Sequence, residues 1–291
     1  MILVFGSINI DVVVPVPELP RPGETVLGGD YALLPGGKGA NQALAARRAG
    51  AAVTLAGAVG TDDFAGLALA GLERDGVDTS LVRRVAAPTG CAAIMVSAAA
   101  ENLIAVAPGA NREAAAAQIP DSLLGAETVL VTQMEVPALQ TAALIRRVSR
   151  AGGRTILNLA PALPLDPSLL PQIDLLVCNE GEAASLGAEP ERIAALLRTG
   201  LVVTSGAKGA AFFAADGGRV AVPALPVAAV DTTGAGDTFV GVLAEGIDRG
   251  LALAPALRRA SSAAALACLS AGAQSAMPRG VEIDAAAARL P

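Results

Sequence analysis

The chain has 291 residues, of which 53% are hydrophobic, 16% charged and only 2% aromatic, and its formal net charge is −6. Because it contains no histidine, Ser-His-Asp hydrolysis, Cys-His proteolysis, histidine-ligated zinc and histidine phosphorelay are excluded. The acidic balance argues against nucleic-acid partners, and three scattered cysteines favour a reducing, cytoplasmic setting over a disulfide framework.

Short apolar runs bounded by turn residues recur along the chain and predict buried strands. These strands are expected at residues 2–5, 53–56, 128–131, 155–158, 175–178 and 201–204. Stretches rich in Ala, Leu and Arg predict helices between and after them, at residues 41–49, 65–74, 138–150, 193–198, 236–248 and 255–270. The alternation predicts an α/β fold, a three-layer sandwich with a central, mainly parallel sheet flanked by helices.

Two segments interrupt this rhythm. Residues 11–34 combine apolar alternation with Pro and Gly, and residues 89–106 contain a predicted β-pair, 89–96 and 103–106. They predict a small sheet that projects from the main body, either as a lid over an active site or as an edge or dimer surface. No low-complexity linker divides the chain, so residues 1–291 are expected to form one domain.

The mean hydropathy of +0.55 raises the question of a membrane segment. The longest uncharged stretch, residues 260–278, consists mostly of Ala and Ser, which is too weakly apolar to span a bilayer. The N-terminus has no basic region before its apolar run, so it is expected to form a buried first strand rather than a signal peptide.

The segment DTTGAGDTF, residues 231–239, precedes a predicted helix. Gly234 and Gly236 permit a tight turn whose N–H groups converge at the helix start, which is an anion site by geometry and by the helix dipole. Asp237 lies in the first helical turn, where a carboxylate can take a proton from an attacking hydroxyl. The alternative is an ordinary Asp-capped turn.

A second glycine-rich segment, GGKGANQ at residues 36–42, opens the first predicted helix. Its glycines let the main chain approach a ligand closely, while Lys38 adds a cation and Asn41 an amide. The segment is not a P-loop, and no dinucleotide fingerprint follows the first strand. Close backbone, Lys and Asn together suit a ligand with many hydroxyl groups.

Four segments carry a resemblance that runs nearly end to end. GSINID (6–11), GGKGANQA (36–43), NEGEA (179–183) and DTTGAGDTF (231–239) stand in the order and spacing of the ribokinase branch of the phosphofructokinase B-type sugar kinases. The resemblance implies transfer of the γ-phosphoryl group of MgATP to a primary hydroxyl of a sugar. It also implies a lid formed by residues 11–34 and 89–106, and a homodimer in which two lids clasp each other.

The resemblance assigns a role to each matching residue. Asp237 matches the general base, and Gly234, Ala235 and Gly236 match the anion hole. The sugar-binding positions, which include Asp237, are otherwise Asn9, Asp11, Gly37, Lys38, Gly39, Asn41 and Glu135. The alternative is that Asn9 and Asp11 are turn residues and that Glu135 is a charge at a helix start.

The nucleotide side is implied in the same way. The ATP-binding positions are Asn179, Thr204, Gly206, Gly209, Gly236 and Ser261. Magnesium is expected near Asn179 and Glu182 through water, although Glu182 also fits a solvated helix residue. With no aromatic residue near these positions in the sequence, adenine is expected between apolar side chains and backbone.

A monovalent cation, usually potassium, lies beside the anion hole in ribokinases. The matching positions are Asp231, Thr233, Ala267, Ser270, Gly272 and Ala276. The family commonly has a Ser at the position of Ala276, so we expect weaker cation dependence here.

The resulting expectation is ATP-dependent phosphorylation of D-ribose at its 5-hydroxyl, giving D-ribose 5-phosphate. A nucleoside kinase of the same family is the nearest alternative, but one Tyr and five Phe leave little material for an aromatic clamp on a base. A catalytically silent sugar-binding regulator is the alternative outside enzymes, and the retained Asp237 argues against it.

Overall fold

The computed structural model describes residues 1–99 and 101–290, which contain two β-sheets. The larger sheet has nine strands in the order β13-β12-β11-β10-β9-β8-β1-β4-β5. The seven neighbouring strands from β11 to β5 in this sheet order pair in parallel. Strand β12 pairs antiparallel with β11, and β13 pairs antiparallel with β12. In chain order its strands are β1 (Ile2–Phe5), β4 (Val53–Val59), β5 (Asp78–Arg84), β8 (Val129–Thr132), β9 (Arg154–Asn158), β10 (Leu175–Asn179), β11 (Gly200–Thr204), β12 (Ala210–Ala214) and β13 (Arg219–Val222).

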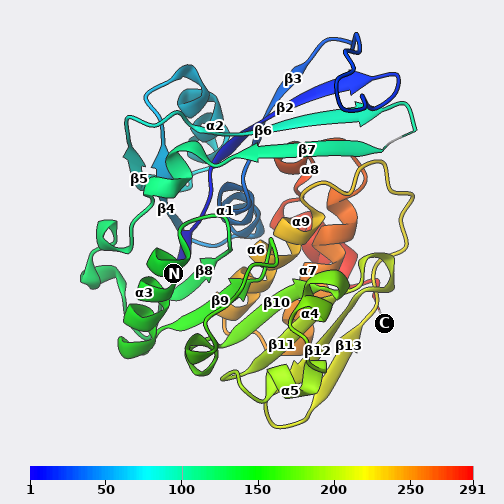
Figure 1. Ribbon diagram of the computed structural model, residues 1–291. Helices are drawn as coiled ribbons and strands as arrows, with labels where there is room; N and C mark the ends of the chain where they lie inside the picture. The colour runs from blue at the N-terminus through cyan, green and yellow to red at the C-terminus, as the bar shows by residue number, and fades with distance from the viewer. Residues whose placement is uncertain (100, 291) are drawn as a thin grey trace.

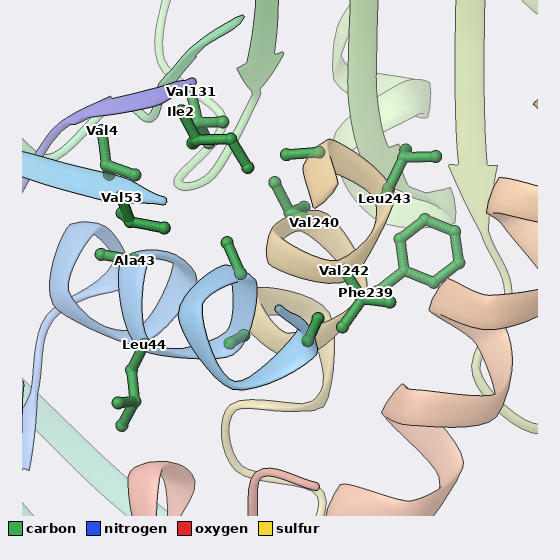
Figure 2. Close-up of a cluster of buried hydrophobic side chains, with 14 of the residues drawn as sticks. Ile2, Val4, Ala43, Leu44, Val53, Val131, Phe239, Val240, Val242 and Leu243 are labelled. Carbon is green, nitrogen blue, oxygen red and sulfur yellow. The ribbon is translucent and has the colours of Figure 1, made fainter. Parts of the chain in front are cut away.

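Helices cover both faces of this sheet, because alternate side chains of each strand point to opposite faces. In β1, Ile2 and Val4 belong to one buried cluster and Leu3 and Phe5 to another. The first cluster is covered by α1 (Lys38–Ala49), α2 (Asp63–Arg74), α6 (Ala235–Asp248), α7 (Leu253–Ala267) and α9 (Gly280–Ala287). The second is covered by α3 (Ala138–Arg150), α4 (Glu180–Ser185) and α5 (Pro190–Ala194). The short helix α8 (Ala273–Ala276) follows α7. Figure 2 shows α1 and α6 side by side beneath Ile2 and Val131 of the sheet.

The second sheet has four strands in the order β3-β2-β6-β7, and it lies across one edge of the main body (Figure 1). It consists of β2 (Asn9–Val16), β3 (Ala32–Gly36), β6 (Gly90–Ser97) and β7 (Asn102–Ala107). The two β-rich segments therefore pair with each other, as expected, through parallel pairing of β2 with β6. Residue 100, within the expected segment 89–106, lies outside the described residues.

The α/β fold class and all six expected strands are confirmed, while strand β13 and helices α4, α8 and α9 are present without having been expected. The helix expected at 193–198 is wrong: α5 spans Pro190–Ala194, because Pro190 suits a first helical position and the chain then turns toward β11. Strand β5 was not expected, because its edge position leaves it polar and partly exposed. In the described part of the chain, no helix has the length and apolar character that a membrane crossing requires.

Candidate active site

The expected site residues gather at the carboxyl ends of the parallel strands. From β1 the chain reaches β4 on one side, whereas β8 pairs with the other side of β1. Such a switch point opens a crevice in which α/β proteins bind ligands. Polar residues at or just beyond these strand ends are Ser7 (β1), Gln133 and Glu135 (β8), Asn158 (β9), Asn179 (β10) and Thr204 (β11).

Glycines allow the start of α1 to approach β1 and β2 closely. A Cβ on Gly39 would lie 2.5 Å from the carbonyl carbon of Gly6, and one on Gly37 would lie 2.8 Å from the backbone nitrogen of Asn9. Gly37 also has a φ of 90°, a backbone angle that residues other than glycine rarely adopt. The glycines of GGKG therefore place Lys38 and Asn41 against the end of the first strand.

Asp237 lies in the first turn of α6 and is only 8% exposed. The helix begins after Gly234, whose φ of 75° is left-handed, and no side chain within the described residues caps this start. The Ala235 N–H already donates to the Thr232 carbonyl oxygen at 3.2 Å, so the remaining N–H groups of the turn and the helix dipole make it suitable for an anion. Both carboxylate oxygens of Asp237 accept hydrogen bonds from α1: Oδ2 from Asn41 Nδ2 at 2.9 Å and Oδ1 from Gln42 Nε2 at 2.9 Å.

A chain of buried amides extends from this carboxylate. Gln42 Nε2 also donates to Asn158 Oδ1 at 3.0 Å, and its Oε1 accepts from Gln133 Nε2 at 2.6 Å. On the other side, Gln274 Nε2 donates to Asn41 Oδ1 at 3.1 Å. We assigned no role to Gln42, Gln133, Asn158 or Gln274 from the sequence. Gln133 and Asn158 were detectable only as polar residues at strand ends.

The residues assigned to the sugar line the other side of Lys38. Glu135 Oε2 accepts hydrogen bonds from the Ser7 hydroxyl and from the Lys38 backbone N–H. Asn9 Oδ1 accepts from Asn111 Nδ2 at 2.7 Å, which leaves the Asn9 amide nitrogen to donate to a ligand. Asn111 was also missed, and it is 1% exposed.

Several charges face one another here. The pKa of Asp11 is raised to about 6: burial contributes most, the negative charges of Glu135 and Asp237 add to it, and Lys38 partly opposes them. Burial alone would lower the pKa of Lys38, but the surrounding carboxylates outweigh it and raise that pKa above its usual value. These carboxylates belong to Asp237, Glu135, Glu182 and Asp11. One ammonium group thus lies among four acidic residues, an arrangement that suits a neutral polyol beside a metal-bound phosphate.

Two adjoining cavities bring together the residues assigned to the nucleotide and the anion hole with Lys38 and Asp237, whereas Asn9, Asp11 and Glu135 line neither cavity. The smaller, of about 150 Å³, is lined by Lys38, Asn158, Asn179, Glu182, Thr204, Gly234, Gly236 and Asp237, among others. The larger, of about 480 Å³, is mostly apolar and is lined by Thr204, Gly206, Gly209, Gly236, Phe239 and Ser261, among others. Thr204 and Gly236 border both cavities, so a bound molecule can extend from one into the other.

The nucleotide-side residues differ in one respect from the expectation. Phe239, which we placed only in a helix, lines the larger cavity, so one aromatic side chain contributes to a wall expected to be aliphatic. The Ser261 hydroxyl donates to the Pro223 carbonyl oxygen at 2.8 Å. Asn179 and Glu182 cap α4 reciprocally: each side-chain oxygen accepts from the other residue's backbone N–H at 2.8 Å.

Of the positions assigned to a monovalent cation, side-chain hydrogen bonds within the described residues connect only Asp231, Thr233 and Gly272. Asp231 Oδ1 accepts from the Thr233 hydroxyl and backbone N–H, and Asp231 Oδ2 accepts from the Gly272 N–H at 2.8 Å. Ala267 ends α7 and Ala276 ends α8, while Ser270 is exposed between them. Over residues 1–99 and 101–290, no three acidic or cysteine side chains cluster closely enough to hold a metal ion by themselves.

Comparison with known proteins places this geometry in a family context. Residues 1–279 match the profile of the pfkB family carbohydrate kinases. A ribokinase from Bacillus subtilis is 37% identical over 287 residues, covering 97% of this chain and 98% of its own. The crystal structure of ribokinase from Thermotoga maritima superposes with a TM-score of 0.91 at 32% identity, covering 98% of both chains. Ribokinase from Arabidopsis thaliana, complexed with ribose and ATP, has a TM-score of 0.89 at 29% identity and the same coverage.

Relatives with other substrates are also similar. A deoxyribokinase from Salmonella typhi is 34% identical over 292 residues, covering 95% of each chain. A nucleoside kinase from Burkholderia thailandensis, solved in complex with inosine, has a TM-score of 0.86 at 25% identity, covering 99% of this chain and 96% of that one.

Proposed function

Because the chain belongs to the pfkB family of carbohydrate kinases, we propose that it transfers the γ-phosphoryl group of ATP to the 5-hydroxyl of D-ribose, giving D-ribose 5-phosphate. One observation carries the proposal: the buried Asp237 carboxylate stands at the uncapped start of α6, in a cavity it shares with Lys38. A base and an anion site in one turn are what phosphoryl transfer to a hydroxyl requires.

In the proposed reaction, Asp237 takes the proton of the 5-hydroxyl as that oxygen bonds to the γ-phosphorus. The bond from the phosphorus to the bridging oxygen breaks, and ADP leaves with the electron pair. The backbone N–H groups of Gly234 and Gly236 are proposed to face the negative charge that develops on the phosphoryl oxygens, whereas that of Ala235 donates to the Thr232 carbonyl oxygen at 3.2 Å. Positioning and electrostatic stabilisation supply most of the rate in such a transfer.

Hydrogen bonds to hydroxyl groups select the sugar. Glu135 uses one oxygen to hold Ser7 and Lys38, so its other oxygen can accept from a sugar hydroxyl. Asn9 offers its amide N–H groups, and Asp11 offers a carboxylate over Gly36. A site built in this way discriminates against an analogue that lacks a hydroxyl, because its polar groups then stay unpaired.

The donor nucleotide occupies the two adjoining cavities. The base lies in the apolar cavity beside Ser261 and Phe239, and the phosphates extend past Thr204 and Gly236 toward Asp237. Asn179 and Glu182 offer oxygen ligands, each with capacity beyond the capping bond, which fits a magnesium ion held through water. A magnesium ion bound there offsets the negative charge of the phosphates.

A monovalent cation fits this chain less well than it fits the family pattern. Asp231 can supply one carboxylate, although both its oxygens already hold the loop at Thr233 and Gly272. Ala267, Ser270, Gly272 and Ala276 offer backbone carbonyls, and Ala276 has no hydroxyl to add. Potassium therefore activates this enzyme weakly, by charge near the anion hole.

The small sheet is the proposed lid and dimer surface. Its edge strand β7 exposes Leu103, Ile104 and Val106, each about half accessible. An exposed apolar edge strand is stabilised by pairing with another copy. We therefore expect a homodimer joined through the lids.

ADP release with ribose, 2-deoxyribose, fructose and adenosine at equal concentrations tests the proposal. The expected result is the highest kcat/KM for ribose. Preference for 2-deoxyribose or adenosine identifies a deoxyribokinase or a nucleoside kinase instead. No turnover with any of the four contradicts the proposal and favours a silent sugar-binding protein.

A further inference from the structure

The Gln42 side chain is completely buried and uses all three of its strong hydrogen-bonding groups. Its two N–H groups reach Asp237 Oδ1 at 2.9 Å and Asn158 Oδ1 at 3.0 Å. Its carbonyl oxygen accepts from Gln133 Nε2 at 2.6 Å. A glutamine in the interior of a helix has no local need for these partners, because they come from α6, β9 and the loop after β8.

A backbone carbonyl determines which atom of each amide in this chain donates and which accepts. The Val177 carbonyl oxygen of β10 can only accept, so Asn158 turns its Nδ2 toward it, at 3.1 Å. Asn158 must then present Oδ1 to Gln42, which in turn must present Nε2 to both Asn158 and Asp237. Reversing the Gln42 amide would set nitrogen against nitrogen at Gln133 and oxygen against oxygen at Asp237.

The carboxylate of Asp237 needs such an external constraint. Rotation of an aspartate carboxylate about its terminal bond is broad, so steric preferences alone leave its oxygens poorly oriented. Catalytic groups must be held within about 10–20° of the productive geometry. Gln42 Nε2 donates to Asp237 Oδ1, while Asn41 Nδ2 donates to Asp237 Oδ2, so both carboxylate oxygens are held from α1.

We propose that Gln42 is a positioning residue for phosphoryl transfer: it holds Asp237 Oδ1 so that the carboxylate presents its free lone pairs to the substrate hydroxyl in the cavity. The inference rests on the proposed role of Asp237 as the base. Gln42 itself touches no reacting atom, and it acts through Asp237 alone.

Three variants test this role. Gln42→Leu removes the donor to Asp237 at nearly constant volume. Gln42→Glu keeps the oxygen that accepts from Gln133 but sets a second carboxyl group against Asp237. Gln118→Leu is the matched control, because the Gln118 amide also makes three hydrogen bonds, to Gly57, Leu81 and Ala115, and lines neither cavity.

For Gln42→Leu we expect kcat to fall about 10- to 100-fold with ribose KM within about twofold, since misplacing a catalytic group by 1 Å can cost a hundredfold. Gln118→Leu should lose comparable thermal stability and keep its kcat. For Gln42→Glu we expect the acid limb of the kcat–pH profile to move to higher pH, because two facing carboxyl groups share a proton. Asp11 and Lys38 interact with the charge of Asp237, and Glu135 and Glu182 lie with them around the Lys38 ammonium; all four are unchanged in this variant.

Crystal structures of the wild type and Gln42→Leu separate this inference from the proposed function. We expect the Asp237 carboxylate to rotate or to occupy two orientations in the variant. An unchanged carboxylate, a kcat equal to that of Gln118→Leu, or an unshifted pH profile for Gln42→Glu would overturn the inference. If the wild type phosphorylates no sugar, the proposed function fails, and the two crystal structures still decide what Gln42 does.

Discussion

Gly241 controls how closely the helix carrying Asp237 can approach the helix carrying Gln42. A Cβ at this position in α6 would lie 2.5 Å from the Gln42 carbonyl oxygen, 2.7 Å from Ala45 Cβ and 2.9 Å from the Ala46 nitrogen. Ordinary contacts of such atoms are about 3.5 Å, so Gly241→Ala requires α1 and α6 to separate by about 1 Å. The nearest of these atoms is part of Gln42 itself, so the separation loosens the hold on Asp237.

Overpacking of this kind typically costs about 1–3 kcal/mol, and the better helix propensity of alanine offsets up to about 1 kcal/mol of it. The net loss of about 0–3 kcal/mol corresponds, for a chain of this size, to a fall in Tm of up to about 5 °C. We expect kcat to fall about 10- to 100-fold, because the base is displaced from the hydroxyl. Scanning calorimetry and the ADP-release assay measure the two effects.

Gly66→Ala is the matched control. Gly66 also lies within a helix, α2, but a Cβ there would meet no heavy atom within 4 Å. This variant should gain about 0.5–1 kcal/mol of stability and keep its kcat. If Gly241→Ala behaves like Gly66→Ala in both assays, close packing of α1 on α6 does not position the base.

Two further predictions concern charge. The pKa of Asp11, raised to about 6, means that the folded chain holds this proton more tightly than the unfolded chain, so the free energy of unfolding falls as pH rises from about 4 to 6, by up to about 3 kcal/mol. Asp11→Asn should therefore raise Tm at pH 7.5 but not at pH 4, and an equal Tm difference at both pH values would contradict this stability effect. In the wild type, the KM for ribose should rise below pH 6, as Asp11 gains its proton. Replacing potassium by lithium should lower turnover modestly, and Ala276→Ser should enlarge that difference, whereas equal turnover in both salts for both proteins would exclude the cation site.

The layout of the fold was predictable because parallel strands buried on both faces appear as continuous apolar runs. Strand β1 and strand β10 are examples, and each is followed directly by polar residues that line the crevice. Strand β5 escaped prediction, because an edge strand can be polar and partly exposed. Glycine segments were also informative, since Gly37 and Gly234 stand where a left-handed or crowded backbone admits little else.

The amide chain around Asp237 was not predictable from one sequence. Gln42, Gln133, Asn158 and Gln274 come from four separate elements, and no spacing relates them. Their hydrogen bonds exist only because the strand ends converge and α1 packs tightly against α6. Phe239 illustrates the same limit: helix periodicity predicts that it is buried, but not that it borders the larger cavity.

The most direct test of the central claim compares Asp237→Asn with the wild type in two measurements, turnover with ribose and ATP, and ribose binding by calorimetry. The substitution removes the proton acceptor and changes the volume of the side chain little. The account predicts a fall in kcat of at least about a hundredfold, with ribose and ATP affinities nearly unchanged. Turnover near the wild-type value would contradict the assignment of Asp237 as the base.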